Sequence, residues 1–173
     1  MFQKLLIVLV TIFFSVAAQA QPENGMNFDA KLAAGHTAYL GGNYQRALSI
    51  YESAKAISSG NALVYYFIGC AKAKLNQYDE AISTLKIASG IAGEKDQNLH
   101  AKVLFIIAMM EEKRSSFDAA KIAWSNYLSY AKGHADTTSF VSVAEDRIKV
   151  IEVKEQLLKD YAAIKKKSPG NGN

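Results

Sequence analysis

The sequence predicts an all-α protein built of stacked antiparallel helix pairs. The main observation is an internal repeat: Gly35 to Ala54 and Gly69 to Ala88 carry matching residue types, and 69−35, 78−44, 81−47 and 88−54 all equal 34. A fixed period of this size is typical of helical repeat proteins. The two prolines, Pro22 and Pro169, lie outside the repetitive region, so proline interrupts none of the expected helices. Apolar residues make up 50% of the chain and charged residues 21%, which is typical of a folded globular protein.

Residues 1–20 are predicted to be a secretory signal peptide. Lys4 gives a positive start, an apolar run follows from Leu5 to Ala17, and Ala18-Gln19-Ala20 has the small-x-small form of a cleavage site. An uncleaved membrane anchor is the alternative, but the run is shorter than the roughly 20 residues needed to span a bilayer. We therefore expect an exported protein, periplasmic or secreted, with no stable membrane insertion after cleavage. Residues 21–27 follow as a flexible lead-in.

Two helix pairs are expected next, over about 28–61 and 62–95. The first helix begins at Phe28 and stops at Gly41-Gly42, and Asn43 is a suitable cap for the second. In the second pair, Asn76-Gln77 separates a helix over 63–75 from one over 78–91. A longer polar connection is predicted over 90–98, because it contains two glycines and three charges.

A third pair is expected over about 101–134. Phe117-Asp118-Ala119-Ala120 takes the place of Tyr78-Asp79-Glu80-Ala81, but the interval is 120−81 = 39, so about one turn of helix or loop has been added before it. Tyr127 takes the place of the small residue Ala88. A bulky side chain there suggests that the following helix docks differently or that no fourth pair follows.

A single long helix is predicted over about 137–166, followed by a disordered tail at 168–173. Its apolar residues form two columns rather than one, headed by Val143 and Ala144. One neighbouring helix pair needs only a narrower stripe. The additional apolar residues either cover more of the helix array or contact a second chain, so a monomer and a homodimer both stay open.

These features resemble the tetratricopeptide repeat (TPR) family, and with the predicted leader they resemble its exported bacterial members. The pattern of that family asks for small residues at two close helix crossings, an aromatic residue at the start of the second helix, and a large residue one turn later. Here these are, in order, Gly35, Gly69 and Ala108; Ala47, Ala81 and Ala120; Tyr44, Tyr78 and Phe117; and Tyr51, Leu85 and Trp124. The resemblance implies three pairs stacked as a short right-handed superhelix, closed by the long C-terminal helix.

The resemblance also implies that the first helix of each pair lines a concave groove that binds a partner. Carried onto this sequence, that surface consists of Leu32, His36, Tyr39, Tyr66, Cys70, Lys74, Phe105, Met109 and Lys113. Its apolar and aromatic character does not reproduce the charged clamp by which related grooves hold a terminal carboxylate. It fits a protein segment that is apolar with some negative charge. The alternative is that several of these side chains are simply buried.

Catalytic and cofactor motifs are not found. The sequence has no glycine-rich phosphate loop, CxxC, HExxH or GxSxG, so we expect no enzyme activity, no cofactor and no metal. The net charge of +4 is too mild and too dispersed to predict nucleic-acid binding. The lone Cys70 excludes an intrachain disulfide and is expected to be a small semi-buried side chain, with an intermolecular disulfide as the alternative.

Three functions from different classes stay open at this point. The first is a non-enzymatic scaffold or adaptor in the cell envelope that binds a partner segment in the groove. The second is a self-associating structural subunit that dimerises through the C-terminal helix. The third is a regulatory subunit of an envelope or cell-wall enzyme. The identity of the partner and the biological process are not encoded in a scaffold of this kind.

Overall fold

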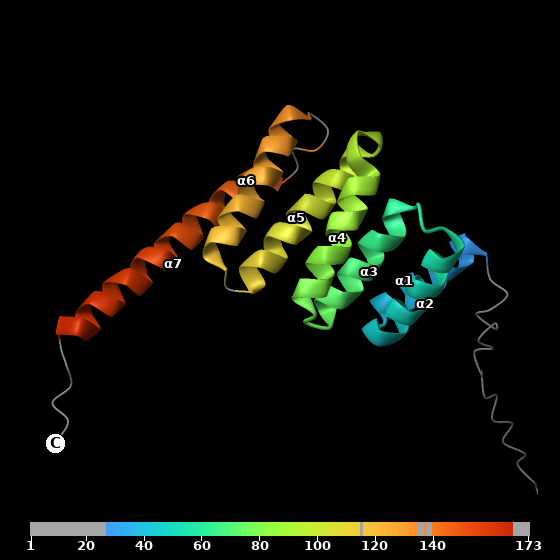
Figure 1. The fold of residues 1–173 in the computed structure, drawn as a ribbon, viewed down its shortest axis with the longest axis horizontal. Helices are drawn as coiled ribbons and strands as arrows, with labels where there is room; N and C mark the ends of the chain where they lie inside the picture. The colour runs from blue at the N-terminus through green and yellow to red at the C-terminus, as the bar shows by residue number, and fades with distance from the viewer. Residues whose placement is uncertain (1–26, 115, 135–136, 138–139, 168–173) are drawn as a thin grey trace, which may run out of the picture.

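The computed structural model describes residues 27–114, 116–134, 137 and 140–167. Within these residues the chain forms seven α-helices and one short 3₁₀-helix, with no strand, so the predicted all-α class is confirmed (Figure 1). The helices are α1 (Phe28–Leu40), α2 (Tyr44–Ile57), α3 (Ala62–Lys74), α4 (Tyr78–Ala92), η2 (Gly93–Lys95), α5 (Gln97–Lys113), α6 (Phe117–Gly133) and α7 (Val141–Lys167). The predicted signal peptide, residues 21–26 of the lead-in and the predicted tail lie outside the described residues.

Side-chain caps start several of these helices where the sequence places Asn or Asp. The side-chain oxygens of Asn27, Asn43, Asn61 and Asp96 each accept a hydrogen bond from a backbone N–H of the following turn, at 2.9–3.2 Å. Each bond satisfies a donor that the helix itself leaves unpaired. Asn27 therefore caps α1 and does not belong to the lead-in, where the sequence analysis placed it.

The crossings inside the helix pairs are built from a small residue facing a large one. A Cβ atom added to Gly35 would lie 2.4 Å from Cε1 of Tyr51, and one added to Gly69 would lie 2.6 Å from Cγ of Leu85. Both distances are far below ordinary contact, so only glycine allows this approach. In the third pair, Ala108 and Trp124 hold the same two places, and both are buried. The small and large residues of the repeat pattern are thus packing residues.

The connection between the second and third pairs is shorter than predicted. Helix α4 continues through Gly90 to Ala92, the 3₁₀-turn follows, and α5 already begins at Gln97. Gly93, with φ of +45°, ends α4 in a conformation that glycine adopts most easily. The prediction of a connection over 90–98 was therefore wrong, and the added turn of the third pair is the first turn of α5.

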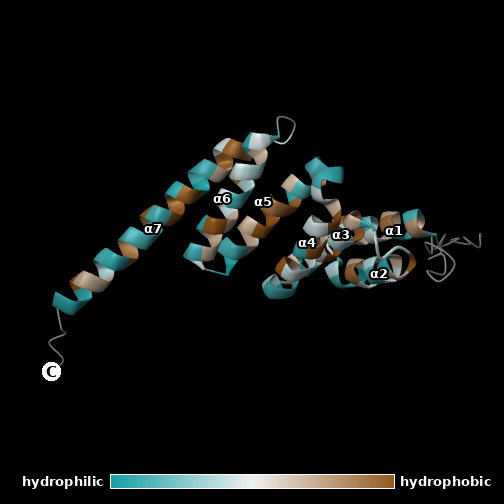
Figure 2. Ribbon diagram, turned by 45° about the horizontal axis from the view of Figure 1, so that its top comes forward, coloured by the Kyte–Doolittle hydropathy of each residue, from teal (hydrophilic) through white to brown (hydrophobic). Residues whose placement is uncertain are grey.

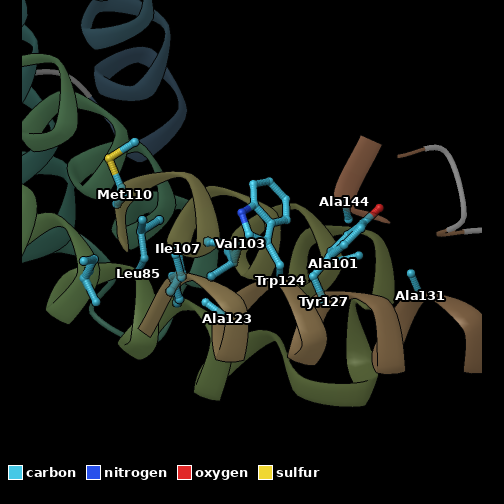
Figure 3. Close-up of a cluster of buried hydrophobic side chains, with 14 of the residues drawn as sticks. Leu85, Ala101, Val103, Ile107, Met110, Ala123, Trp124, Tyr127, Ala131 and Ala144 are labelled. Atoms are coloured by element: carbon cyan, nitrogen blue, oxygen red, sulfur yellow. The ribbon is translucent and has the colours of Figure 1, made fainter. Parts of the chain in front are cut away.

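The core divides into two clusters along the stack. The N-terminal cluster lies between α1, α2 and α3 and is centred on Tyr51, Ala54 and Ile68. The larger cluster runs from α4 to α7 and includes Trp124 and Tyr127 (Figure 3). Figure 2 shows apolar and polar residues alternating along each helix, as expected when only one side of a helix meets its neighbours.

Helix α7 packs as the first helix of a further pair would. Residues buried against the preceding pair recur at Val64, Val103 and Ala144, with 103−64 = 39 and 144−103 = 41. A second set recurs at Ala71, Met110 and Ile151 with the same intervals of 39 and 41. The fourth place equivalent to Gly69 and Ala108 therefore falls on Lys149 (149−108 = 41), whose side chain is 71% exposed.

Tyr127 marks where the standard docking changes. Its side chain is fully buried and points toward Ala144 of α7, and its hydroxyl donates to the carbonyl oxygen of Thr137 at 3.4 Å (Figure 3). Here the large residue lies on α6 and the small one on α7. Helix α7 thus docks on a bulky residue, which is one of the two interpretations that the sequence left open.

The apolar surplus of α7 does not cover the array. Val143, Val150, Val153, Leu157, Leu158, Tyr161 and Ile164 are exposed by 39–67%. Figure 1 shows the C-terminal part of α7 running past the end of α6. Within the described part of the chain, no helix is both long enough and apolar enough to cross a membrane.

Candidate functional site

A cavity of about 420 Å³ lies between α1, α3 and α5. It brings together five of the nine residues predicted to line the groove, namely Tyr39, Cys70, Lys74, Met109 and Lys113. The remaining lining residues are Ala73, Asn76, Tyr78, Ile106 and Met110. Its walls are mainly apolar and aromatic, and both lysines lie at the C-terminal ends of their helices. We call this cavity the central cavity.

A second cavity of about 290 Å³ lies beside it and brings together two more predicted residues, Tyr66 and Phe105. Ile106 lines both cavities, so they are parts of one surface. The Phe105 ring also lies 5.0 Å from the Trp124 ring and 5.3 Å from the Tyr127 ring, both edge-on. Phe105 therefore supports the core as well as the cavity wall.

Leu32 and His36 are not brought together with the other predicted residues. Neither lines the cavities described here. Leu32 is half-buried against the N-terminal cluster, and the His36 ring lies 5.7 Å from the Phe67 ring. The position of Leu32 therefore fits a packing role, which was the alternative interpretation of the predicted groove residues, better than it fits a binding role.

Cys70 lies in the central cavity as a free, half-buried thiol. Burial raises its pKa to about 11, although the Tyr66 hydroxyl that donates to its sulfur opposes that shift. The same surroundings raise the pKa of Tyr39 to about 12, again mainly by burial. Both groups are neutral at physiological pH, so the charges of the central cavity come from its lysines.

A third cavity of about 550 Å³ extends the groove onto α7. Met109 and Lys113 line both it and the central cavity, and α7 contributes Val143, Arg147 and Lys154. Sequence reasoning missed these three α7 residues. The signal that finds them is the pair of intervals 39 and 41, which aligns α7 with α3 and α5.

Ion pairs fix the wall of this third cavity. The carboxylate of Glu112, whose side chain is 11% exposed, accepts from Arg147 Nε at 3.0 Å and from Trp124 Nε1 at 3.4 Å. A second Arg147 nitrogen, Nη2, donates to the other carboxylate oxygen. Lys154 Nζ lies 4.0 Å from the same carboxylate. Arg147 is therefore largely neutralised by Glu112, whereas Lys154 stays at the rim.

The histidines do not form a metal centre. His100 and His134 both lie against the Tyr130 ring, at 4.5 and 4.1 Å between centroids, and His134 also contacts Glu94 at 3.2 Å. Among the described residues, no group of three or more His, Cys, Asp or Glu side chains is arranged to hold a metal ion. The raised pKa of His134 follows mainly from its hydrogen bond to the Tyr130 carbonyl, and then from Glu94.

Comparison with known proteins finds similarity in structure. No protein-family model matches the chain, and no curated protein matches it in sequence. Similar solved structures include SycD, the Yersinia enterocolitica type III secretion chaperone, in complex with a peptide of the translocator YopD, at 12% identity and a TM-score of 0.65 over 79% of this chain and 98% of that one.

PcrH of Pseudomonas aeruginosa, in complex with the chaperone binding region of PopD, is 16% identical with a TM-score of 0.65, over 76% of this chain and 97% of that one. The TPR domain of Arabidopsis OM64 is 20% identical with a TM-score of 0.58, over 70% of this chain and 93% of that one. At these identities the likeness concerns the fold. The chain therefore has a tetratricopeptide-like helical-repeat fold.

Proposed function

We propose that the protein is a non-enzymatic adaptor of the cell envelope that binds a segment of another protein in its concave groove. The observation that carries this proposal is the central cavity, where five side chains from three separate helices meet on one surface. Concave surfaces with apolar walls and a few polar groups are typical binding sites. The envelope location rests on the predicted leader.

Two of the structurally similar proteins support a peptide-binding role. The SycD structure contains a peptide of YopD, and the PcrH structure contains the chaperone binding region of PopD. The chemistry of the bound segment follows from the cavity walls. Tyr39, Ile106 and Met109 favour apolar side chains, whereas Lys74 and Lys113 favour negative charge at the edge.

Site-specific photocrosslinking tests this proposal. A photoreactive residue is placed at Met109, which is 39% exposed in the groove, or at Ile122, which is 63% exposed on α6 and lines none of the three cavities. We expect a defined crosslinked protein from envelope extract at Met109 and not at Ile122. Adding Tyr39→Ala should weaken that crosslink without changing helicity measured by circular dichroism. Equal crosslinking at both positions, or none at Met109, would refute a groove-bound partner.

A second candidate function is self-association through α7. The observation that favours it is the apolar stripe of α7, where Leu157, Leu158, Tyr161 and Ile164 are 58–67% exposed. Exposed apolar stripes on a helix commonly mark a protein contact. Light scattering of the purified protein at micromolar concentration tests it. A dimer that becomes a monomer with Leu157→Glu supports this function, and a monomeric unmodified protein excludes it.

A further inference from the structure

Residues 156–167 form the end of α7 that projects from the array, and we call them the projecting segment. Glu155, the residue before them, still pairs with Lys121 of α6 at 2.8 Å. Every residue from 156 to 167 is exposed, and Figure 1 shows this part of α7 running past the end of α6. Packing within the array therefore does not account for the side chains that the projecting segment carries.

One side of the projecting segment is apolar. Its large apolar side chains, which are 58–67% exposed, are Leu157, Leu158, Tyr161 and Ile164. Successive residues of an α-helix are turned by about 100°, so these four side chains fall within an arc of about 120°. Figure 2 shows the resulting alternation of apolar and polar residues along α7. A single exposed apolar residue is ordinary on a protein surface, but a stripe of four on an unpacked segment indicates a surface that a partner covers.

The projecting segment is also strongly basic. Its four lysines are Lys159, Lys165, Lys166 and Lys167. Its one carboxylate is Asp160, so the net charge of the segment is 4−1 = +3. Three of the lysines lie about 120° or more from the centre of the apolar stripe, and Lys165 lies beside the stripe in the last turn. Among the described residues, no ion pair joins any of the four to a carboxylate, so their charge is available to a partner.

We propose that the projecting segment binds the surface of an anionic lipid bilayer. This inference goes beyond the adaptor function, because it concerns the end of α7 rather than the cavities of the groove. A helix with one apolar and one basic side lies in the plane of the membrane interface and does not cross the bilayer. The apolar stripe would enter the interface, where tyrosines such as Tyr161 are enriched. The lysines would extend their ammonium groups to the lipid headgroups.

Charge favours a lipid surface over a second copy of the chain as the occupant of this stripe. The whole of α7 carries seven Lys and Arg residues and five Asp and Glu residues, which gives a net charge of 7−5 = +2. Two copies of α7 in contact would therefore bring together two helices of like net charge, and the excess is concentrated in the projecting segments. An anionic bilayer supplies the opposite charge along the whole segment. The lipid surface is therefore the occupant we assign.

A polarity-sensitive dye tests where the chain meets lipid. In a Cys70→Ser background, the dye NBD is attached at Leu157→Cys, or at Ile122→Cys on α6, where the native side chains are 61% and 63% exposed. Vesicles contain equal parts of phosphatidylserine and phosphatidylcholine. On adding them, we expect the emission at position 157 to shift to the blue and to rise about twofold or more, with no change at position 122. The dye reports only its own surroundings, so insertion of the predicted leader would not reproduce this difference.

Variants of the segment test its two sides separately, with the same dye measuring partition onto the mixed vesicles. Lys165→Gln combined with Lys166→Gln should weaken partition about 25-fold, because each lysine near an anionic surface strengthens binding about fivefold. The matched control, Lys86→Gln combined with Lys95→Gln, removes the same charge from exposed lysines of α4 and η2 and should change partition by less than about twofold. Leu158→Ala removes apolar carbons from the stripe and should weaken partition at least about tenfold.

Three results would overturn the proposal. A dye at position 157 that is already blue-shifted without vesicles, together with a dimer in light scattering, would assign the stripe to a second copy of the chain. An equal shift with vesicles of phosphatidylcholine alone would remove the lysines from the interaction. An unchanged spectrum with the mixed vesicles would exclude lipid binding by this segment. The photocrosslink at Met109 is measured independently, so failure of the adaptor function and failure of lipid binding are distinguishable.

Discussion

In the second helix pair, Gly69 of α3 lies so close to Leu85 of α4 that a single added carbon would collide with it. In α7 the equivalent place is held by the exposed Lys149, and no second helix packs there in the described part of the chain. Yet Ala144 and Ile151 are buried against the preceding pair as fully as Val64 and Ala71 of α3. One face of α7 thus continues the array, and the other ends it. The difference teaches that separate residues of one helix determine its packing on the preceding helix pair and its packing against a following helix.

The largest expected effect separates the packed half of α7 from its projecting half. Ile151→Ala removes a fully buried side chain and should lower the free energy of unfolding by about 2–5 kcal/mol. Leu157→Ala, at a residue that is 61% exposed, should change it by less than about 0.5 kcal/mol. Urea unfolding followed by circular dichroism measures both. A comparable loss in the two variants would mean that Leu157 is covered in solution, as the dimer requires.

The next effect contrasts the equivalent places directly. Gly69→Ala should destabilise the protein by about 1–3 kcal/mol, because the new Cβ would lie 2.6 Å from Leu85 Cγ. Lys149→Ala should stay within about 0.5 kcal/mol. Gly90→Ala is the matched control, since nothing lies within 4 Å of a Cβ there, and it should stabilise α4 by about 0.5–1 kcal/mol. A neutral Gly69→Ala would contradict the close crossing.

A smaller effect is expected where charge fastens α7 to α5. Arg147→Ala leaves the mostly buried Glu112 carboxylate with only Trp124 Nε1 and the more distant Lys154. Because the Arg147 side chain is 40% exposed, we expect a loss of only about 1 kcal/mol. Asp146→Ala, which removes an exposed pair with Lys149, should show no measurable change; urea unfolding followed by circular dichroism measures both variants. Equal losses of stability in the two variants would mean that removing any charged side chain from α7 has this effect, and that the Glu112 carboxylate has no special role.

The last comparison uses thiol reactivity to test the groove faces of α3 and α7. Cys70 is half-buried and its pKa is raised to about 11, whereas Val150, at the equivalent place on α7 (150−70 = 39+41), is 39% exposed. In a Cys70→Ser background, Val150→Cys should react with iodoacetamide about 100-fold faster at pH 8 than Cys70 does in the unmodified protein. The rate for Cys70 should rise with pH up to about 11. Similar rates at pH 8 would mean that Cys70 is open to solvent.

The same pKa shift predicts a direction for stability. Burial raises the pKa of the Cys70 thiol in the folded protein to about 11, above its ordinary value of 9.0. The stabilisation from keeping the thiol neutral is therefore complete below pH 9 and is lost as the pH rises toward 11. Unfolding at pH 8 and pH 11 in the unmodified protein and in Cys70→Ser should show a larger loss in the unmodified protein.

The repeat pattern determined most of the fold because its residues act locally. Gly35 and Gly69 can be recognised from spacing alone, since a close helix crossing needs a small residue in each unit. The end of α4 could not be predicted in the same way. Gly90 and Gly93 are both glycines within the same short stretch, and only the structure shows that Gly93 takes the positive φ while Gly90 stays helical.

The groove could be predicted in part for a related reason. Lys74 and Met109 follow from the phase of their helices, and the structure places them in one cavity. Arg147 and Lys154 were missed because α7 carries no repeat signature and follows at an interval of 41 rather than 34. Their contribution depends on how α7 docks, and Tyr127, Ala144 and Ile151 are buried together in that contact.

The two core clusters have a consequence for how the molecule opens. Each helix packs mainly on the helices before and after it, so the contacts are local and the array behaves as a chain of linked units. The pair α1–α2 belongs to the smaller cluster and can unfold without breaking the larger one. Amide hydrogen exchange should then be faster in α1 and α2 than in α5 and α6. A segment bound across α3, α5 and α7 would contact three units at once, so its binding should slow hydrogen exchange in all three helices.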